Sequence, residues 1–239
     1  MKKKKVSLMP LVVILILIIL TAAGLYYYKY IFLENNRYLG KWVRHADLSE
    51  YVEEAMGDWF GDALLAGVVS YGNEQAIIEV KLSVDVSGGY TETISDSEYE
   101  KALVSAKKMA EEGLRDFLEK RLEAADATPD KTGKSLDELA QEVLGMSISE
   151  YIDEYAPELL PNIDELREDI LYNGTYKVSG DIITLITPGK TTAIDYVATD
   201  KYFVLNNETE DPSAIGMPIG QDESNKKSEF KYPVVYTKK

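Results

Sequence analysis

Residues 76–86 read AIIEVKLSVDV and contain the clearest strand pattern in the sequence. Apolar side chains stand at every second position, namely Ile78, Val80, Leu82, Val84 and Val86. Because successive side chains of a strand point to opposite faces, this alternation predicts a strand with one buried face. Gly88 and Gly89 indicate a turn, and residues 90–95 are expected to return as the hairpin partner. An antiparallel sheet is therefore the starting point for the fold.

Similar strand patterns lie at both ends of the region that follows residue 37. Residues 38–46 predict a first strand, and five further segments follow much later in the chain: 175–179, 182–187, 191–198, 202–205 and 230–237. The turn signals Gly180-Asp181, Pro188-Gly189 and Thr199-Asp200 separate the first four of these segments at hairpin spacing. The C-terminal part is therefore expected to form an antiparallel meander.

Between the two groups of strands, residues 96–171 have helical spacing of their apolar side chains. Ser95 with Glu98, and Ser135 with Glu138, match the capping box that opens a helix, and Asn162 is expected to cap another. Residues 47–67 predict an earlier helix with a break at Gly57 or Gly61. The predicted fold class is α+β, with an antiparallel sheet, either open or closed into a barrel, that is interrupted by a helical block at about 96–171.

The N-terminus combines a basic start with a long apolar segment. Lys2 to Lys5 precede Val6 to Tyr28, and no acidic residue occurs before Glu34. A helix of these 23 residues would be about 34 Å long, enough for a hydrocarbon core of about 30 Å. Because basic flanks stay in the cytoplasm, we expect a cytoplasmic stub at 1–5 and a transmembrane signal anchor at 6–28. A juxtamembrane linker at 29–37 and an extracytoplasmic domain at 38–239 would follow, which places the protein at the cell membrane.

A cleaved signal peptide is the alternative interpretation of the same segment. Thr21-Ala22-Ala23 before Gly24 offers the small residues that a processing site needs. The protein would then be secreted rather than anchored. The sequence has no cysteine, so a lipidated N-terminal cysteine is excluded. Both interpretations place the folded domain outside the cytoplasm.

Charge and composition narrow the possible partners. The chain has 41 acidic and 26 basic residues, and five of the basic ones are Lys2–Lys5 and Lys29. The exported part is therefore strongly acidic, which argues against nucleic acid as a partner because phosphate binding needs a basic surface. The absence of cysteine also excludes thiol catalysis and zinc–thiolate sites.

No motif indicates a catalytic, metal-binding or cofactor-binding residue. His45 is the single histidine, and a lone histidine after a strand is expected at the surface. Asp126, Thr128, Asp130 and Asp137 have the spacing of a calcium loop, but Lys131 stands where the turn needs glycine. We therefore expect an ordinary loop and a helix N-cap at this position, with no cofactor and no metal.

Gly40-Lys41-Trp42 on the first strand, followed by the C-terminal meander that includes Tyr176-Lys177-Val178-Ser179-Gly180-Asp181, resembles the lipocalin-like domains of exported or membrane-anchored bacterial proteins. The resemblance implies an antiparallel barrel in which Gly40 and Trp42 are packing residues that close one end. The helical block would be an insertion into this barrel.

These observations favour a membrane-anchored, non-catalytic binding or interaction domain outside the cytoplasm. Its partner would be an envelope protein or a small apolar ligand, and Ile78, Val80 and Leu82 are the residues expected to line a ligand cavity. A cavity would indicate ligand binding, whereas a filled core would favour a role in protein interaction. An exported hydrolase with paired carboxylates and a cation-dependent adhesion or scaffold protein are the alternatives.

Overall fold

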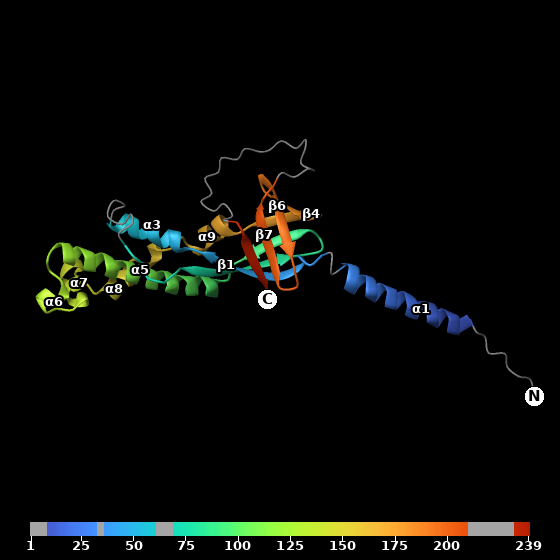
Figure 1. Cartoon of the computed structure of the whole chain (residues 1–239), viewed down its shortest axis with the longest axis horizontal. Coiled ribbons are helices and arrows are strands. Elements are labelled where there is room, and N and C mark those ends of the chain that lie inside the picture. Colours follow the sequence, from blue (N-terminus) through green and yellow to red (C-terminus); the bar gives the residue numbers. More distant parts are fainter. Residues whose placement is uncertain (1–8, 33–35, 61–68, 210–231) are drawn as a thin grey trace, which may run out of the picture.

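The computed structural model describes residues 9–32, 36–60, 69–209 and 232–239. An eight-stranded barrel lies at the centre of the molecule, with helix α1 at one end and a layer of helices at the other (Figure 1). The described chain is therefore an α+β structure built on an antiparallel barrel.

The barrel strands follow one another in sequence order, and β1 closes the barrel by pairing with β8. All pairs are antiparallel. The strands are β1 Gly40–Asp47, β2 Ile77–Val84, β3 Gly89–Thr93, β4 Asn173–Ser179, β5 Ile182–Thr187, β6 Lys190–Ala198, β7 Tyr202–Glu208 and β8 Val234–Lys238. The antiparallel sheet and the C-terminal meander expected from the sequence are both present.

Strands β1 and β2 form a ribbon that extends beyond the barrel. They pair along their whole length, from Gly40 with Val84 to Asp47 with Ile77, whereas β3 pairs with β2 only from Lys81 to Val84. The other half of β2 lies against helix α5, Asp96–Ala124. One strand therefore contributes side chains to two different parts of the interior.

The helical layer is inserted into the barrel at two points. Helix α3, Ser49–Phe60, connects β1 to β2, and a longer series of helices connects β3 to β4. That series consists of α5, α6 Pro129–Thr132, α7 Leu136–Leu144, α8 Ile148–Tyr155, the 3-10 helix η2 Ala156–Glu158, and α9 Ile163–Ile170. Since β3 and β4 are neighbours in the barrel, these helices are an insertion between two paired strands.

Two hydrophobic cores follow from this arrangement. The helical core includes Ile78 and Val80 of β2, which pack with the alanine-rich face of α5. The barrel core includes Leu82 and Val84 of the same strand. Small side chains on α5, such as Ala102 and Ala106, allow the helix to approach the sheet closely because little volume separates the two elements.

Helix starts agree with the sequence predictions, with two differences. Ser135 and Asn162 cap α7 and α9 through complete capping boxes, as predicted. Ser95 precedes α5 but makes no side-chain capping bond, so the predicted capping box there is wrong. The break predicted at Gly57 or Gly61 is not at Gly57, because α3 continues to Phe60 and buries Gly57; Gly61 lies outside the described residues.

The N-terminal segment forms α1, Met9–Tyr26, and continues as a π-helix, η1, Tyr27–Phe32. Large apolar side chains of α1 are exposed, namely Ile14, Ile16, Leu17, Ile18, Ile19, Leu20 and Leu25. In the residues that the structure describes, we find no helix whose length and apolar character together suffice to cross a membrane. The predicted span began at Val6, and residues 1–8 lie outside the described part of the chain.

Candidate functional site

Large side chains fill the interior of the barrel. Aromatic rings follow one another through it: Tyr38 lies edge-to-face with Tyr196, Tyr196 contacts Phe203, and Phe203 contacts both Trp42 and Tyr236. Ring-centre distances in this series lie between 5.6 and 6.0 Å. Such spacing is that of packed aromatic pairs, so the rings occupy the volume that a ligand would need.

Gly40 and Trp42, the fold-marking residues of the sequence, lie at the start of β1. Gly40 has a φ of +129°, a backbone conformation that favours glycine because it has no Cβ. Trp42 is completely buried, and its Nε1 donates a hydrogen bond to the carbonyl oxygen of Tyr38 at 2.8 Å. The tryptophan thereby holds the segment that enters the barrel.

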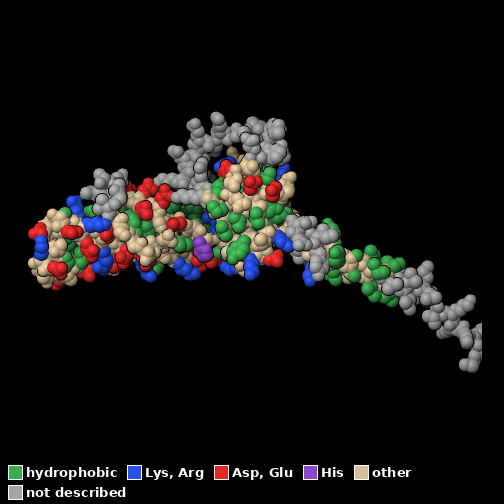
Figure 2. Space-filling view, viewed as in Figure 1, with side chains coloured by type: hydrophobic (Ala, Val, Ile, Leu, Met, Phe, Trp, Pro, Cys, Tyr) green, Lys and Arg blue, Asp and Glu red, His purple; other side chains and the backbone are tan. Residues whose placement is uncertain are grey.

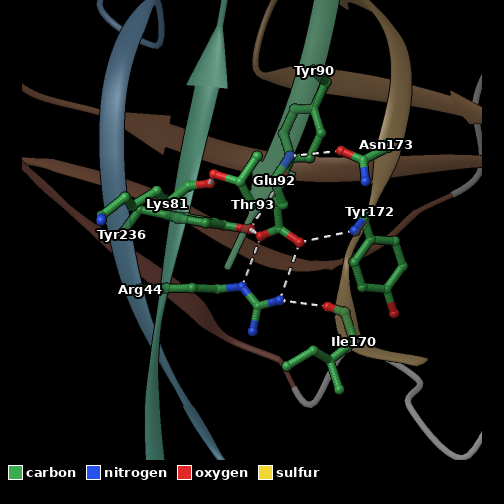
Figure 3. Close-up of polar contacts among 9 residues, drawn as sticks. All are labelled: Arg44, Lys81, Tyr90, Glu92, Thr93, Ile170, Tyr172, Asn173 and Tyr236. Carbon is green, nitrogen blue, oxygen red and sulfur yellow. Dashed lines mark hydrogen bonds and ion pairs between the residues drawn. The ribbon is translucent and has the colours of Figure 1, made fainter. Parts of the chain in front are cut away.

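A buried ion pair lies where the barrel meets the helical layer (Figure 3). Arg44 on β1 donates from Nε to Glu92 Oε1 at 2.7 Å and from Nη2 to Glu92 Oε2 at 3.1 Å. The Arg44 side chain is 10% exposed and that of Glu92 is completely buried. Strand alternation explains both positions, since Arg44 follows Trp42 by two residues and Glu92 follows Tyr90 by two.

Each of the two oxygens of the Glu92 carboxylate accepts two hydrogen bonds. Besides the two arginine bonds, Oε1 accepts from the Tyr236 hydroxyl at 2.8 Å and Oε2 accepts from the backbone N–H of Tyr172 at 2.9 Å. The Tyr236 hydroxyl donates its single proton to Glu92. In its 2.8 Å contact with the Tyr90 hydroxyl, Tyr236 must therefore be the acceptor and Tyr90 the donor. The network is therefore saturated, and the carboxylate has no open position for a substrate.

The same network holds the end of the helical insertion. Nη2 of Arg44 also donates to the carbonyl oxygen of Ile170 at 2.7 Å, and the Asn173 side chain accepts from the Glu92 backbone N–H at 2.8 Å. These bonds fix the chain as it leaves α9 and enters β4. We call the set Arg44, Glu92, Tyr90, Tyr236 and the backbone of 170–173 the buried clamp.

The protonation of the clamp follows from burial and charge. Burial by itself would lower the pKa of Arg44, but the adjacent Glu92 carboxylate outweighs it and raises the pKa above its ordinary value. Burial raises the pKa of Tyr90 and of Tyr236 well above the usual value, and the Glu92 charge adds to it. Arg44 stays charged and both tyrosines stay neutral at physiological pH, so the arrangement supports packing and orientation rather than proton transfer.

The three residues expected to line a cavity are divided between the two cores. Ile78 and Val80 are buried among the helices, and Leu82 is buried inside the barrel. Two hollows on the described surface lie elsewhere, one along α1 and one at the α1 end of the barrel. A ligand-lining role for these residues stays a prediction.

The hollow at the end of the barrel is shallow and open. It measures about 270 Å³ and is lined partly by Arg37, Tyr38, Asp181 and Tyr196. Tyr38 is almost completely buried there, between the rings of Tyr176 and Tyr196. The rings of Tyr38 and Tyr196 therefore form part of the wall of the hollow.

The other residues weighed in the sequence lie on the surface. His45 is exposed on β1. Asp126 forms an ion pair with Lys131 beside the short helix α6, and Ser135 caps the next helix. Among the described residues, no group of three or more histidine, aspartate or glutamate side chains has the proximity that a metal ion requires.

The helical layer carries a cluster of five aromatic side chains, which we call the aromatic patch: Trp59, Phe60, Phe117, Tyr151 and Tyr155. Trp59 contacts both tyrosines of α8, and Phe60 contacts Phe117 of α5 at 4.8 Å between ring centres. All five side chains are half-buried. Trp59, Phe60, Phe117 and Tyr151 pack on the helical core with one side, and all five side chains leave part of their area at the surface.

Charge is distributed unevenly between the two parts of the molecule. Residues 96–171 contain 21 acidic and nine basic side chains, and α3 adds four acidic residues and no basic one. The eight strands together contain five acidic and six basic residues. Figure 2 shows Asp and Glu side chains gathered over the helical layer. The acidic character of the chain therefore belongs to the helices.

Sequence reasoning missed the buried clamp and the aromatic patch. A signal for the clamp existed, because Arg44 and Glu92 occupy inward positions of strands whose neighbouring inward residues are apolar. The patch required knowledge of how α3, α5 and α8 pack. Comparisons with protein-family models, with curated proteins and with solved structures found no match.

Proposed function

We propose that this protein is a membrane-anchored, non-catalytic interaction domain that works outside the cytoplasm. In this proposal the lipocalin-like barrel is a rigid support, and the acidic helical layer is the part that meets a partner. The filled barrel interior carries the proposal. Trp42, Phe203, Tyr90 and Tyr236 are at most 1% exposed and occupy the space in which a barrel of this kind would hold a small ligand.

The buried clamp is consistent with a barrel that supports the helical layer and a helical layer that meets the partner. It joins β1, β3 and β8 to the end of the helical insertion through bonds of 2.7 to 3.1 Å. Such a connection restricts movement of the insertion relative to the barrel, because a displacement would break the buried hydrogen bonds from Arg44 to the Ile170 carbonyl and from the Tyr172 N–H to Glu92. A rigid connection suits a domain that presents a surface at a fixed orientation.

The membrane anchor is proposed from the sequence between Lys2 and Tyr28. Four lysines, Lys2 to Lys5, precede the apolar segment, and all 41 acidic residues follow it. Figure 1 shows the acidic helical layer at the far end from α1, so in an anchored orientation the layer would project away from the membrane and be accessible to a partner. In the proposed orientation the barrel, with its balanced charge, would lie nearer to the lipid.

Location is testable with single-cysteine variants because the chain has no cysteine of its own. We expect Ser97→Cys, at an exposed position of α5, to react with a membrane-impermeant maleimide in intact bacterial cells. The matched variant Lys3→Cys should react only after lysis, and carbonate washing should leave the full chain in the membrane. Labelling of Lys3→Cys but not Ser97→Cys in intact cells would refute the proposed orientation.

The filled barrel is testable with a fluorescent fatty acid as the apolar probe. If the interior is closed, energy transfer from Trp42 to the probe should not saturate at micromolar concentrations of the probe. Trp42→Phe serves as the matched control for signal from the other tryptophan. Saturable transfer that disappears in Trp42→Phe would show a ligand site in the barrel and would replace this proposal with ligand binding.

A further inference from the structure

We propose that the aromatic patch is the docking site for a basic segment of a partner protein, with arginine or lysine side chains laid over its rings. This inference rests on the proposed function and adds the chemistry of the partner. The patch combines half-buried rings, adjacent carboxylates and a cation of this chain that already lies on one ring.

The rings come from three helices and form one continuous group. Trp59 and Phe60 end α3, Tyr151 and Tyr155 lie one turn apart on α8, and Phe117 lies on α5. Tyr151 contacts Tyr155 at 4.7 Å and Phe60 at 6.2 Å between ring centres. Five neighbouring rings offer a larger apolar area than scattered surface aromatics, and aromatic residues are enriched where proteins bind each other.

Carboxylates border this group of rings. The exposed Glu158 accepts a hydrogen bond from Trp59 Nε1 at 2.9 Å, which places its negative charge beside the indole. Glu154 and Glu158 both contribute to the environment of Tyr151, whose pKa is raised by burial first and then by the charges of Tyr155, Glu158 and Glu154. Rings and carboxylates therefore lie together, which is the combination that attracts a cation with an aliphatic stem.

One cationic side chain of this protein, Arg121, already lies over a ring of the patch. The guanidinium carbon of Arg121 lies 5.5 Å from the centre of the Phe117 ring. This distance is within the range of a cation–π interaction. The edge of the patch thus shows, within one molecule, the contact that we propose for a partner.

Charge complementarity selects the partner class. The patch belongs to the part of the molecule where acidic residues outnumber basic ones by more than two to one. An acidic segment or a nucleic acid would be repelled, whereas a basic segment would be steered toward the helical layer. The aliphatic stem of arginine or lysine would cover the rings while its charge meets Glu154 and Glu158.

The two tryptophans make the test selective. Trp42 is completely buried in the barrel, so surface events should change the emission of Trp59 alone. In the purified full chain in detergent, we expect acrylamide to quench part of the emission in the wild type and almost none in Trp59→Phe. Equal protection of both tryptophans would show that the patch is covered and would overturn the inference.

The probe is a short arginine-rich peptide, compared with a peptide that has glutamine in place of each arginine. We expect the arginine peptide to shift Trp59 emission and to bind less tightly at higher salt. In Glu154→Gln/Glu158→Gln, binding should weaken about five-fold, which corresponds to about 1 kcal/mol. Equal binding of the two peptides to the wild-type chain would also overturn the inference.

The matched control is Glu100→Gln/Glu168→Gln, which makes the same change in net charge at exposed positions away from the patch. Glu100 lies about 25 Å along α5 from Phe117, given 1.5 Å per residue. Binding to this control should weaken less than about two-fold, as screening predicts for distant charges. Equal weakening in both double variants would show diffuse attraction without a docking site.

The outcomes separate this inference from the proposed function. Peptide binding is measured on purified protein, and orientation is measured by cysteine labelling in cells. If the chain has the expected orientation but does not bind the arginine peptide, only the docking site is refuted. A chain with the opposite orientation refutes the proposed function, whatever the peptide does.

Discussion

Arg44 and Glu92 lie on strands that do not pair with each other, yet their side chains meet in a two-pronged contact of 2.7 and 3.1 Å. Strand β2 separates them: Arg44 pairs with Val80 and Glu92 pairs with Leu82. The ion pair therefore reaches across the middle strand on the inner side of the ribbon. It lies at the boundary between the helical core and the barrel core.

Removing one member of this pair should destabilise the protein strongly. We expect Arg44→Ala to lower the free energy of unfolding by about 3–5 kcal/mol, because Glu92 would remain as a buried charge without its main partner. The double variant Arg44→Met/Glu92→Leu should recover much of this loss, since it leaves no buried charge. Urea denaturation of the three proteins measures the difference.

An exposed ion pair provides the control for this series. Lys101 donates to Glu98 at 2.8 Å on the surface of α5, and Lys101→Ala should change the free energy of unfolding by less than about 1 kcal/mol. If Arg44→Ala were as mild as Lys101→Ala, the clamp would have no special role in holding the two parts together.

Tyr90 donates a hydrogen bond to Tyr236, which donates to Glu92, so replacing the two tyrosines should lower the free energy of unfolding by unequal amounts. Tyr236→Phe removes a bond to the Glu92 carboxylate and leaves the buried Tyr90 hydroxyl without its acceptor. We expect it to cost about 2–4 kcal/mol, whereas Tyr90→Phe should cost only about 1 kcal/mol because it removes one neutral bond. Thermal and urea unfolding of both variants would reveal the order; equal costs would contradict the donation that we assign.

Stability should fall at alkaline pH. The folded-state pKa values of Tyr90 and Tyr236 are raised above about 10, the value of an unfolded tyrosine. Their contribution is therefore complete below about pH 10 and is lost as pH rises through the folded pKa, by about 1.4 kcal/mol per pH unit for each tyrosine. Urea midpoints between pH 8 and pH 11 measure this slope.

The double variant Tyr90→Phe/Tyr236→Phe is the control for the alkaline series. Its stability should fall less steeply above about pH 10 than that of the wild type. Some slope should remain, because the pKa of Tyr51 and that of Tyr71 are also raised, each to about 12. Identical slopes in the two proteins would show that the clamp tyrosines do not control the alkaline transition.

The strands were predictable from sequence because a half-buried strand has a period of two that needs no tertiary information. Residues 76–86 show this most clearly, and β2 lies within them. The division of β2 between two cores was not predictable, because Ile78 and Leu82 look equivalent in the sequence. Their difference arises from β3, which is too short to cover the first half of β2.

The clamp and the aromatic patch were missed for a related reason. Arg44 and Glu92 are 48 residues apart, and nothing in either local sequence indicates the other. The patch joins Trp59 of α3 to Tyr151 of α8, which are also distant in the chain. Local patterns predict elements, whereas contacts between elements depend on how the helices pack.

Helix capping shows how one motif can have two outcomes. Ser135 accepts from the Glu138 backbone N–H, and the Glu138 side chain accepts from the Ser135 backbone N–H in return. Ser95 and Glu98 have the same spacing, but the Glu98 carboxylate accepts from Lys101 instead. The competing cation removes the carboxylate from its capping position.

Two serine variants test this difference. Ser135→Ala should lower the free energy of unfolding by about 1 kcal/mol, because it leaves an N–H at the start of α7 without its acceptor. Ser95→Ala should change it by less than about 0.5 kcal/mol, since no capping bond is lost. Urea midpoints of the two variants should therefore differ, and equal effects would show that the motif alone determines capping strength.

Gly174 links the clamp to barrel closure, because it pairs with Tyr90 where β3 meets β4. A Cβ at this position would overlap the carbonyl oxygen of Ile186 on the paired strand β5. Backbone cannot move aside as a side chain does, so Gly174→Ala should separate β4 from β5 and destabilise the barrel by several kcal/mol. Gly24→Ala is the matched control, since no atom lies within 4 Å of the added Cβ.

The expected result is a large loss of urea resistance in Gly174→Ala and none in Gly24→Ala. Near-ultraviolet circular dichroism of Gly174→Ala should also lose intensity, because Tyr90 and Trp42 would no longer be held in a closed, asymmetric core. A stable Gly174→Ala variant with an unchanged aromatic spectrum would mean that β4 and β5 tolerate a wider spacing. The clamp, rather than the β4–β5 contact, would then be the feature that keeps the barrel closed.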